Sequence, residues 1–177
     1  MGCWGITAFE SDAGLDSIGY IRKLLPPNGR LELAAIVEAL KRDRVCLPPV
    51  YDGEAHSSPV ALAELVVKLA DQDMAGLDYN GKWAGKDKRF DSLTSCAASR
   101  ESLRWIRDYL VDTLAYAREN AERNGDWNGW FAKEDWDAWQ NHMEALAGRL
   151  DVFLALPCDP VELLASGQQE CRQEMKW

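Results

Sequence analysis

Apolar residues recur every three or four positions along most of this chain, which is the spacing of α-helices that bury one face. The two clearest stripes lie within residues 99–123 and 133–156. The stripes are formed by Leu103, Ile106, Leu110, Leu114, Ala117 and Ala121, and by Trp136, Trp139, Met143, Leu146, Leu150 and Phe153. Only the short, glycine-containing segment 124–132 separates them, so they predict an antiparallel helical hairpin packed along its seam.

Three shorter helices are predicted before this hairpin. The first is capped by Asp12 or Ser11 and runs to about residue 25, where two prolines end it. The second covers residues 31–44. The third covers 58–76 and is opened by a serine cap followed by proline.

The remaining segments lack a helical pattern or are short. Residues 78–98 are locally basic and are predicted to form a surface loop that has room for a short hairpin or helical turn. A short helix is expected over 161–166. Only residues 44–51 have the composition of a strand. The predicted fold is therefore all-α. It is an irregular helical bundle in one domain, 1–177, made of N-terminal helices (1–77), the basic loop (78–98) and the C-terminal part with the long hairpin (99–177).

The charge balance narrows the function classes. The chain has 177 residues, with 29 Asp and Glu against 20 Lys and Arg, a formal charge of −9. Direct nucleic-acid binding is not expected, because it depends on cations that neutralise phosphates. No apolar run is long enough to span a membrane, and the N-terminus lacks the pattern of a signal peptide, so we expect a cytoplasmic protein.

Residues typical of catalytic and metal sites are sparse. The five cysteines are scattered without a Cys-x-x-Cys pair, which favours reduced, buried thiols over a zinc site. Of the two histidines, His56 lies in a polar turn, and His142 borders an apolar stripe and is interpreted as a packed side chain. No glycine-rich phosphate loop occurs. No cofactor or metal is predicted.

The N-terminal segment Met-Gly-Cys-Trp-Gly has a more distinctive pattern. Its glycines allow a tight bend around Trp4, whose indole is predicted to pack on the core. Asp12 and Asp16 lie one turn apart at the start of the first helix. We interpret them as capping and dipole-compensating residues, with a metal site as the alternative.

This opening resembles a bacterial family annotated only as domain of unknown function 4259. Seven positions match its pattern: Met1, Gly2, Trp4, Gly5, Phe9, Asp12 and Asp16. Gly14 replaces the usual alanine. Residues 62–66 resemble the third helix of the family, with its inward glutamate. The resemblance covers about residues 1–75, and it implies a helical fold but no activity.

Two acidic pairs offer an enzymatic alternative. Glu119-x-x-Glu122 and Glu134-x-x-Asp137 resemble the motifs of all-helical nucleotide pyrophosphohydrolases, in which four acids hold magnesium. However, metal-binding acids in a bundle project inward, and at about 100° per residue these four point away from the apolar stripes of their helices. A solvated acidic surface is therefore the favoured interpretation.

Aromatic residues are unusually frequent, with eight tryptophans in the chain. Trp105, Tyr109 and Tyr116 form a second stripe on the helix 99–123, rotated by roughly 110° from its main apolar face. A helix with two apolar faces is either central in the bundle or exposes one face to a partner. Packing within the bundle is favoured, and contact with a partner is the alternative.

These features together predict a non-enzymatic acidic protein that binds and inhibits a protein partner with a basic surface. By analogy with other small acidic bacterial proteins, an immunity or anti-defence role is expected. The candidate binding residues are Trp105, Tyr109, Tyr116, Trp127, Trp130, Glu119, Glu122, Glu134, Asp135 and Asp137. The alternatives are a magnesium-dependent hydrolase and a housekeeping domain that forms a homodimer through the aromatic stripe.

Overall fold

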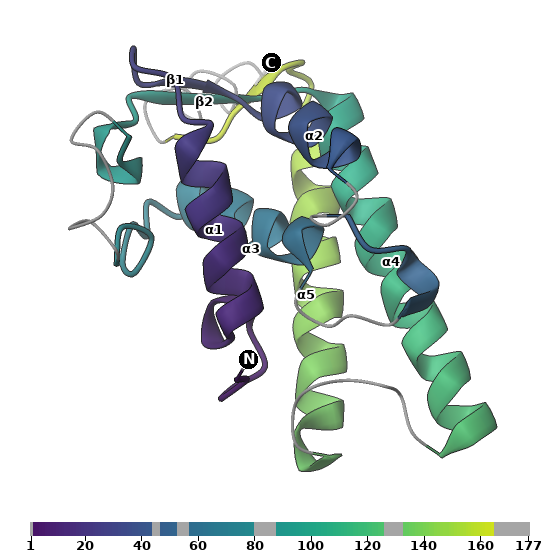
Figure 1. The fold of residues 1–177 in the computed structure, drawn as a ribbon. Coiled ribbons are helices and arrows are strands. Elements are labelled where there is room, and N and C mark those ends of the chain that lie inside the picture. The colour runs from purple at the N-terminus through teal and green to yellow at the C-terminus, as the bar shows by residue number, and fades with distance from the viewer. Residues whose placement is uncertain (1, 44–46, 53–56, 80–87, 126–132, 165–177) are drawn as a thin grey trace.

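The computed structural model describes residues 2–43, 47–52, 57–79, 88–125 and 133–164. Most of them are helical, as predicted, but three short strands form a small sheet (Figure 1). The α-helices are α1 (Asp12–Lys23), α2 (Leu33–Arg42), α3 (Ser58–Ala70), α4 (Arg100–Asn124) and α5 (Trp136–Leu154). Short 3-10 helices are η1 (Ala8–Glu10), η2 (Val50–Asp52), η3 (Phe90–Ser92) and η4 (Lys133–Asp135). None of the described helices has the length and apolarity needed to cross a membrane.

The predicted C-terminal hairpin is confirmed. Ser99 caps α4 by accepting a hydrogen bond from the Ser102 N–H, and Gly125 ends it in the left-handed conformation at φ 67°. α5 packs antiparallel along α4 (Figure 1). Most of the predicted apolar residues of the two helices are buried, namely Leu103, Ile106, Leu110, Leu114, Ala117, Trp139, Met143, Leu146, Leu150 and Phe153.

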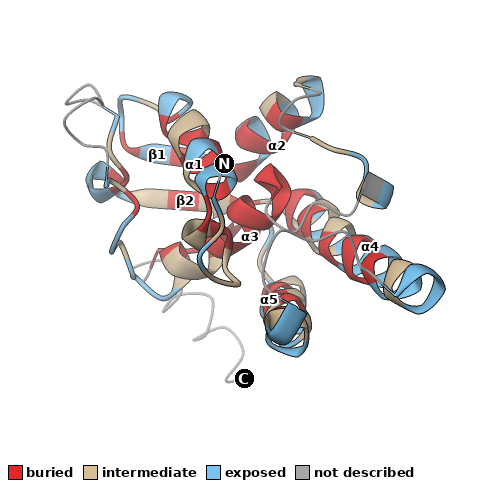
Figure 2. Cartoon of the chain, turned by 60° about the horizontal axis from the view of Figure 1, so that its bottom comes forward, coloured by how far each residue is buried: buried red, intermediate tan, exposed pale blue. Residues whose placement is uncertain are grey.

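Helix α3 is the centre of the fold. Ten of its thirteen residues are buried, and it contacts α1, α4 and α5. Figure 2 shows this burial, in contrast with the exposed far end of α4. A helix that is apolar on all sides needs neighbours on all sides, and α1, α4 and α5 supply them.

The sheet corrects the all-α prediction. Its order is β1 (Arg30–Glu32), β2 (Ser95–Ala98) and β3 (Val161–Glu162), with β1 parallel to β2 and β2 antiparallel to β3. The predicted second helix therefore begins at Leu33, after a strand. The predicted final helix over 161–166 is wrong because its first residues form β3.

The prediction of a surface loop over residues 78–98, of which 80–87 lie outside the described residues, is also wrong in part, although η3 is the helical turn allowed for there. Phe90 and Cys96 are fully buried, and β2 is the central strand. Residues 44–51, which alone have the composition of a strand, form none in their described part, where Val50 begins a 3-10 helix. Residues 44–46 lie outside the described residues.

The N-terminal segment bends tightly, as expected, but Trp4 does not pack on the core. Its side chain is 59% exposed. The Trp4 N–H donates to the Glu10 carbonyl at 2.9 Å, and Cys3 pairs with Ser11 in an isolated bridge. The segment therefore satisfies its own backbone and leaves the indole outside. Ser11 caps α1 by accepting from the Gly14 N–H at 3.0 Å.

The two acids at the start of α1 have different environments. Asp12 is the first helical residue, and its carboxylate accepts the Gly2 N–H at 2.7 Å. Asp16 is exposed one turn further along the helix. Both lie in the first half of α1, where carboxylates compensate the positive end of the helix dipole.

The cysteines differ from the prediction of five reduced thiols. Cys158 is disulfide-bonded. Cys96 is a free, fully buried thiol on β2, where burial and the neighbouring Glu162 raise its pKa to about 12. Cys46 and Cys171 lie outside the described residues.

We expect Gly14→Ala to destabilise the protein by about 1–3 kcal/mol, because the new Cβ would overpack a tight contact. That Cβ would lie 1.7 Å from the Ala8 carbonyl oxygen. The matched control is Gly19→Ala in the same helix, where a Cβ meets nothing within 4 Å. It should raise stability by up to about 1 kcal/mol, because alanine favours helices. Urea unfolding measures both, and equal effects would contradict the close approach of η1 to α1.

A second prediction concerns the pH dependence of stability. The folded protein raises the pKa of Cys96 above its ordinary value of 9.0, so the folded state holds this proton more tightly than the unfolded chain. This contribution is complete below about pH 9 and is lost as pH rises towards about 12. The stability advantage of wild type over Cys96→Ala, measured by urea unfolding, should therefore shrink between about pH 8 and about pH 10. A constant difference would show that the thiol titrates normally in the folded state.

Candidate functional site

The acidic candidate residues lie at the far end of the α4–α5 hairpin. Glu119 and Glu122 are in the last turns of α4, Glu134 and Asp135 are in η4, and Asp137 is in the first turn of α5. All are exposed except Asp135, which is half-buried. Because α4 ends where α5 begins, the antiparallel packing brings the two groups to one end of the hairpin (Figure 1).

These acids are not arranged as a metal site. Within the described ranges, no group of three or more His, Cys, Asp or Glu side chains could hold a metal ion. Glu119 instead pairs with Arg123 on its own helix. The arrangement is that of a solvated surface.

Arginines of the hairpin are held by carboxylates of the same protein. Arg107 donates to Asp108 at 2.9 Å and to Asp151 of α5 at 3.0 Å. These two hydrogen bonds raise the pKa of Arg107. The positive charge of Arg107 therefore faces acids of the hairpin itself.

Two further arginines make similar contacts. Arg118 donates to Glu144 at 2.6 Å and to Gln140 at 2.7 Å, across the hairpin. Arg149 pairs with Asp71 at the end of α3. Residues 107–125 and 133–151 contain nine acids and five Lys or Arg, so they carry −4 of the total charge of −9.

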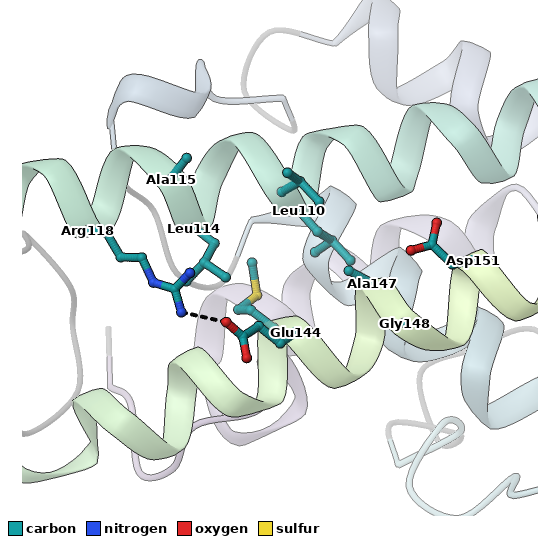
Figure 3. Close-up of a pocket in the computed structure, with 10 residues that line it drawn as sticks. Leu110, Leu114, Ala115, Arg118, Glu144, Ala147, Gly148 and Asp151 are labelled. Carbon is teal, nitrogen blue, oxygen red and sulfur yellow. Dashed lines mark hydrogen bonds and ion pairs between the residues drawn. The ribbon is translucent and has the colours of Figure 1, made fainter.

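A groove of about 360 Å³ runs between α4 and α5 (Figure 3). Its lining includes buried Leu110, Leu114 and Met143, and its sides include the small residues Ala147 and Gly148. The Arg118–Glu144 ion pair spans one end, and Asp151 lies at the other. The lining residues repeat every three or four positions on each helix, so one face of each helix forms one wall. The groove is apolar inside and charged at its ends.

The structure divides the candidate aromatic residues into three groups. Trp105 is half-buried, with Lys41 Nζ 5.5 Å from its ring centroid, and the Tyr109 hydroxyl donates to the Pro48 carbonyl at 2.8 Å. The second stripe of α4 therefore packs partly against α2 and residues 47–52. Tyr116 is 40% exposed. Trp127 and Trp130 lie outside the described residues.

The resemblance implied an inward glutamate on the third helix, and Glu64 of α3 is indeed buried, but sequence reasoning missed its pairing with His142 of α5. Glu64 is 5% exposed and accepts the backbone N–H groups of Ala8 at 2.7 Å and Phe9 at 3.3 Å. His142 Nε2 lies 2.7 Å from Glu64 Oε1 and donates to it, because a carboxylate can only accept. The pair joins η1, α3 and α5 at one point.

The signal for this pair was present in the sequence. Glu64 is the single charged residue within the apolar run 60–67, so a helix there must either expose it or provide partners. The partners come from residues 55 or more positions away, which no local pattern identifies.

Beside the pair is a smaller cavity of about 260 Å³, lined by Thr7, Phe9, Glu64, Val67, Lys68, His142 and Leu146.

Comparison with family models, curated proteins and solved structures finds no match. The resemblance to domain of unknown function 4259 therefore stays a prediction from the N-terminal motif. The function has to be inferred from the chemistry of the sites themselves.

We expect Glu64→Gln to lower the free energy of unfolding by about 2–4 kcal/mol, because a buried carboxylate bound by three donors loses its charge. The control is Glu144→Gln, which removes the charge from the exposed pair with Arg118 and should cost at most about 1 kcal/mol. Thermal and urea unfolding compare the two variants. Equal losses would show that Glu64 contributes no more than a surface ion pair.

Proposed function

We propose that this protein is a non-enzymatic, cytoplasmic binding protein that neutralises a protein partner through its acidic α4–α5 hairpin. The observation that supports this most is the charge of −4 on residues 107–125 and 133–151, whose arginines already pair with acids of this chain. The exposed carboxylates at its end, including Glu122 and Asp137, are available to a cationic surface. Such complementarity accelerates association and selects partners.

An immunity-type or anti-defence inhibitor fits these properties. An inhibitor of a nucleic-acid-binding effector needs an acidic face that covers a basic one, and an array of carboxylates can replace phosphates there. The hairpin provides such a face on two packed helices, which hold the charges in fixed positions. The bacterial origin implied by the resemblance to domain of unknown function 4259 agrees with this role.

The two alternatives have less support. The magnesium hydrolase would use Glu119, Glu122, Glu134 and Asp137, which are exposed and which the described structure does not bring together as a group that could hold a metal ion. The homodimer through the aromatic stripe would use Trp105 and Tyr109, which already contact α2 and Pro48.

The proposal is tested by capturing partners from a lysate of the host with the immobilised protein. Wild type should retain a basic protein that is released by about 0.5 M salt, because screening weakens exposed charge contacts. Glu122→Lys combined with Asp137→Lys should reduce its retention about tenfold or more. Purified wild type should also inhibit the activity of the retained protein.

The control for this experiment carries the same change in net charge elsewhere. Glu32→Lys with Glu38→Lys also replaces two exposed acids, of which Glu32 ends β1 directly before α2 and Glu38 lies within α2. This variant should retain the partner. Equal losses in both variants, or no loss in either, would contradict the hairpin as the binding surface.

A thermal-shift titration with Mg²⁺ and Mn²⁺ tests the enzymatic alternative. A metal site at the hairpin would raise the melting temperature in wild type and not in Glu122→Gln. The binding proposal predicts no difference between the two proteins.

A further inference from the structure

The groove between α4 and α5 has an unusual residue at its edge. Gly148 lies in the interior of α5, where glycine weakens a helix. A Cβ at this position would meet nothing within 4 Å. Packing within the protein therefore does not require glycine here, and its effect is to keep the groove wide.

The groove also has the chemistry of a contact surface. Its floor is apolar, and Val111 at its side is 39% exposed. The small side chains of Ala115, Ala147 and Gly148 allow another backbone to come close to α4 and α5. An occupant would bury apolar side chains against Leu110, Leu114 and Met143.

The apolar floor determines the conformation of the occupant. An extended strand would bring its own N–H and C=O groups onto a surface with few hydrogen-bonding partners. A helix satisfies these groups internally and offers one apolar stripe. The lined stretch covers residues 110–118 of α4 and 143–151 of α5, about 12 Å of each helix and so about two turns.

The charges around the groove determine the flanks of the occupant. Asp108, Asp112 and Glu119 are exposed on α4, and Glu144 and Asp151 are exposed on α5. Arg107, Arg118 and Arg123 pair with all of these acids except Asp112, so the five acids and three arginines together carry a net charge of −2. A helix with lysine or arginine beside its apolar stripe complements this rim.

We propose that this groove binds an amphipathic helix with basic flanks, presented by the protein partner. The inference rests on the proposed function and names the part of the partner that the hairpin receives. The apolar stripe enters the groove, and the flanking cations meet the acids of α4 and α5. Neither of the two alternative functions requires this groove.

The test uses a fluorescein-labelled peptide of about 18 residues, made of leucine and lysine with leucine at helical spacing. A permuted peptide of the same composition, without an apolar stripe, is the peptide control. Fluorescence anisotropy should show one-to-one binding that is about tenfold or more tighter for the amphipathic peptide. Equal affinities, or no binding, would overturn the proposal.

The matched protein variants are Gly148→Leu and Gly19→Leu. Both place a side chain into open space on a helix, but only Gly148 lines the groove. Gly148→Leu should weaken binding of the amphipathic peptide about tenfold, and Gly19→Leu should change it less than about twofold. Circular dichroism confirms that each variant is folded. Equal effects of the two variants would overturn the groove as the site.

The same variants separate this inference from the proposed function. If Gly148→Leu retains the captured host protein while Glu122→Lys with Asp137→Lys loses it, the hairpin binds its partner and the groove proposal is wrong. If Gly148→Leu abolishes peptide binding but both charge-reversed proteins retain the host protein, the groove binds helices and the acidic-surface proposal is wrong.

Discussion

The antiparallel packing of α4 against α5 determines which side chains of these two helices are buried and which stay exposed to contact another molecule. Burial of leucine, methionine and tryptophan along the seam fixes the rotation of both helices, and so fixes which residues face water. The ion pairs Arg107–Asp151 and Arg118–Glu144 join the two helices above this seam. The acids at the far end and the groove between the helices are both consequences of this one contact.

A second constraint is the charge inside the core. Glu64 lies within the most buried helix, and its carboxylate would be very unfavourable there without partners. The N–H groups of Ala8 and Phe9 and the ring of His142 supply them. The N-terminal segment and α5 are thereby attached to α3 by one side chain.

The sequence predicted features that depend on local spacing. The hairpin follows from apolar residues three and four positions apart, and the exposure of Glu119 and Asp137 follows from the same helical phase. The sheet was missed because its pairing is distant, as between Arg30 and Ser95, and each strand is too short to show a period of two. Trp4 was placed wrongly because its hydrophobicity predicts burial, whereas the hydrogen bonds of its own segment hold the indole outside.

The binding groove could not be predicted in the same way. Each wall alone is an ordinary helix face, and the cavity exists only because two faces meet at a particular separation. Gly148 does not stand out in the sequence. Only the structure shows that it lines the groove and has open space beside it. The Glu64–His142 pair likewise depends on three elements that come together only in the folded chain.

The central claim is that the hairpin is the surface that recognises a basic partner. Its most direct test is a two-dimensional amide NMR spectrum of the ¹⁵N-labelled protein, recorded as the amphipathic basic peptide is added. The account predicts that the largest shift changes fall within residues 108–125 and 143–151 and that those of α1 and the sheet stay small. Changes confined to α1, α2 or the sheet, with the hairpin signals unmoved, would contradict it.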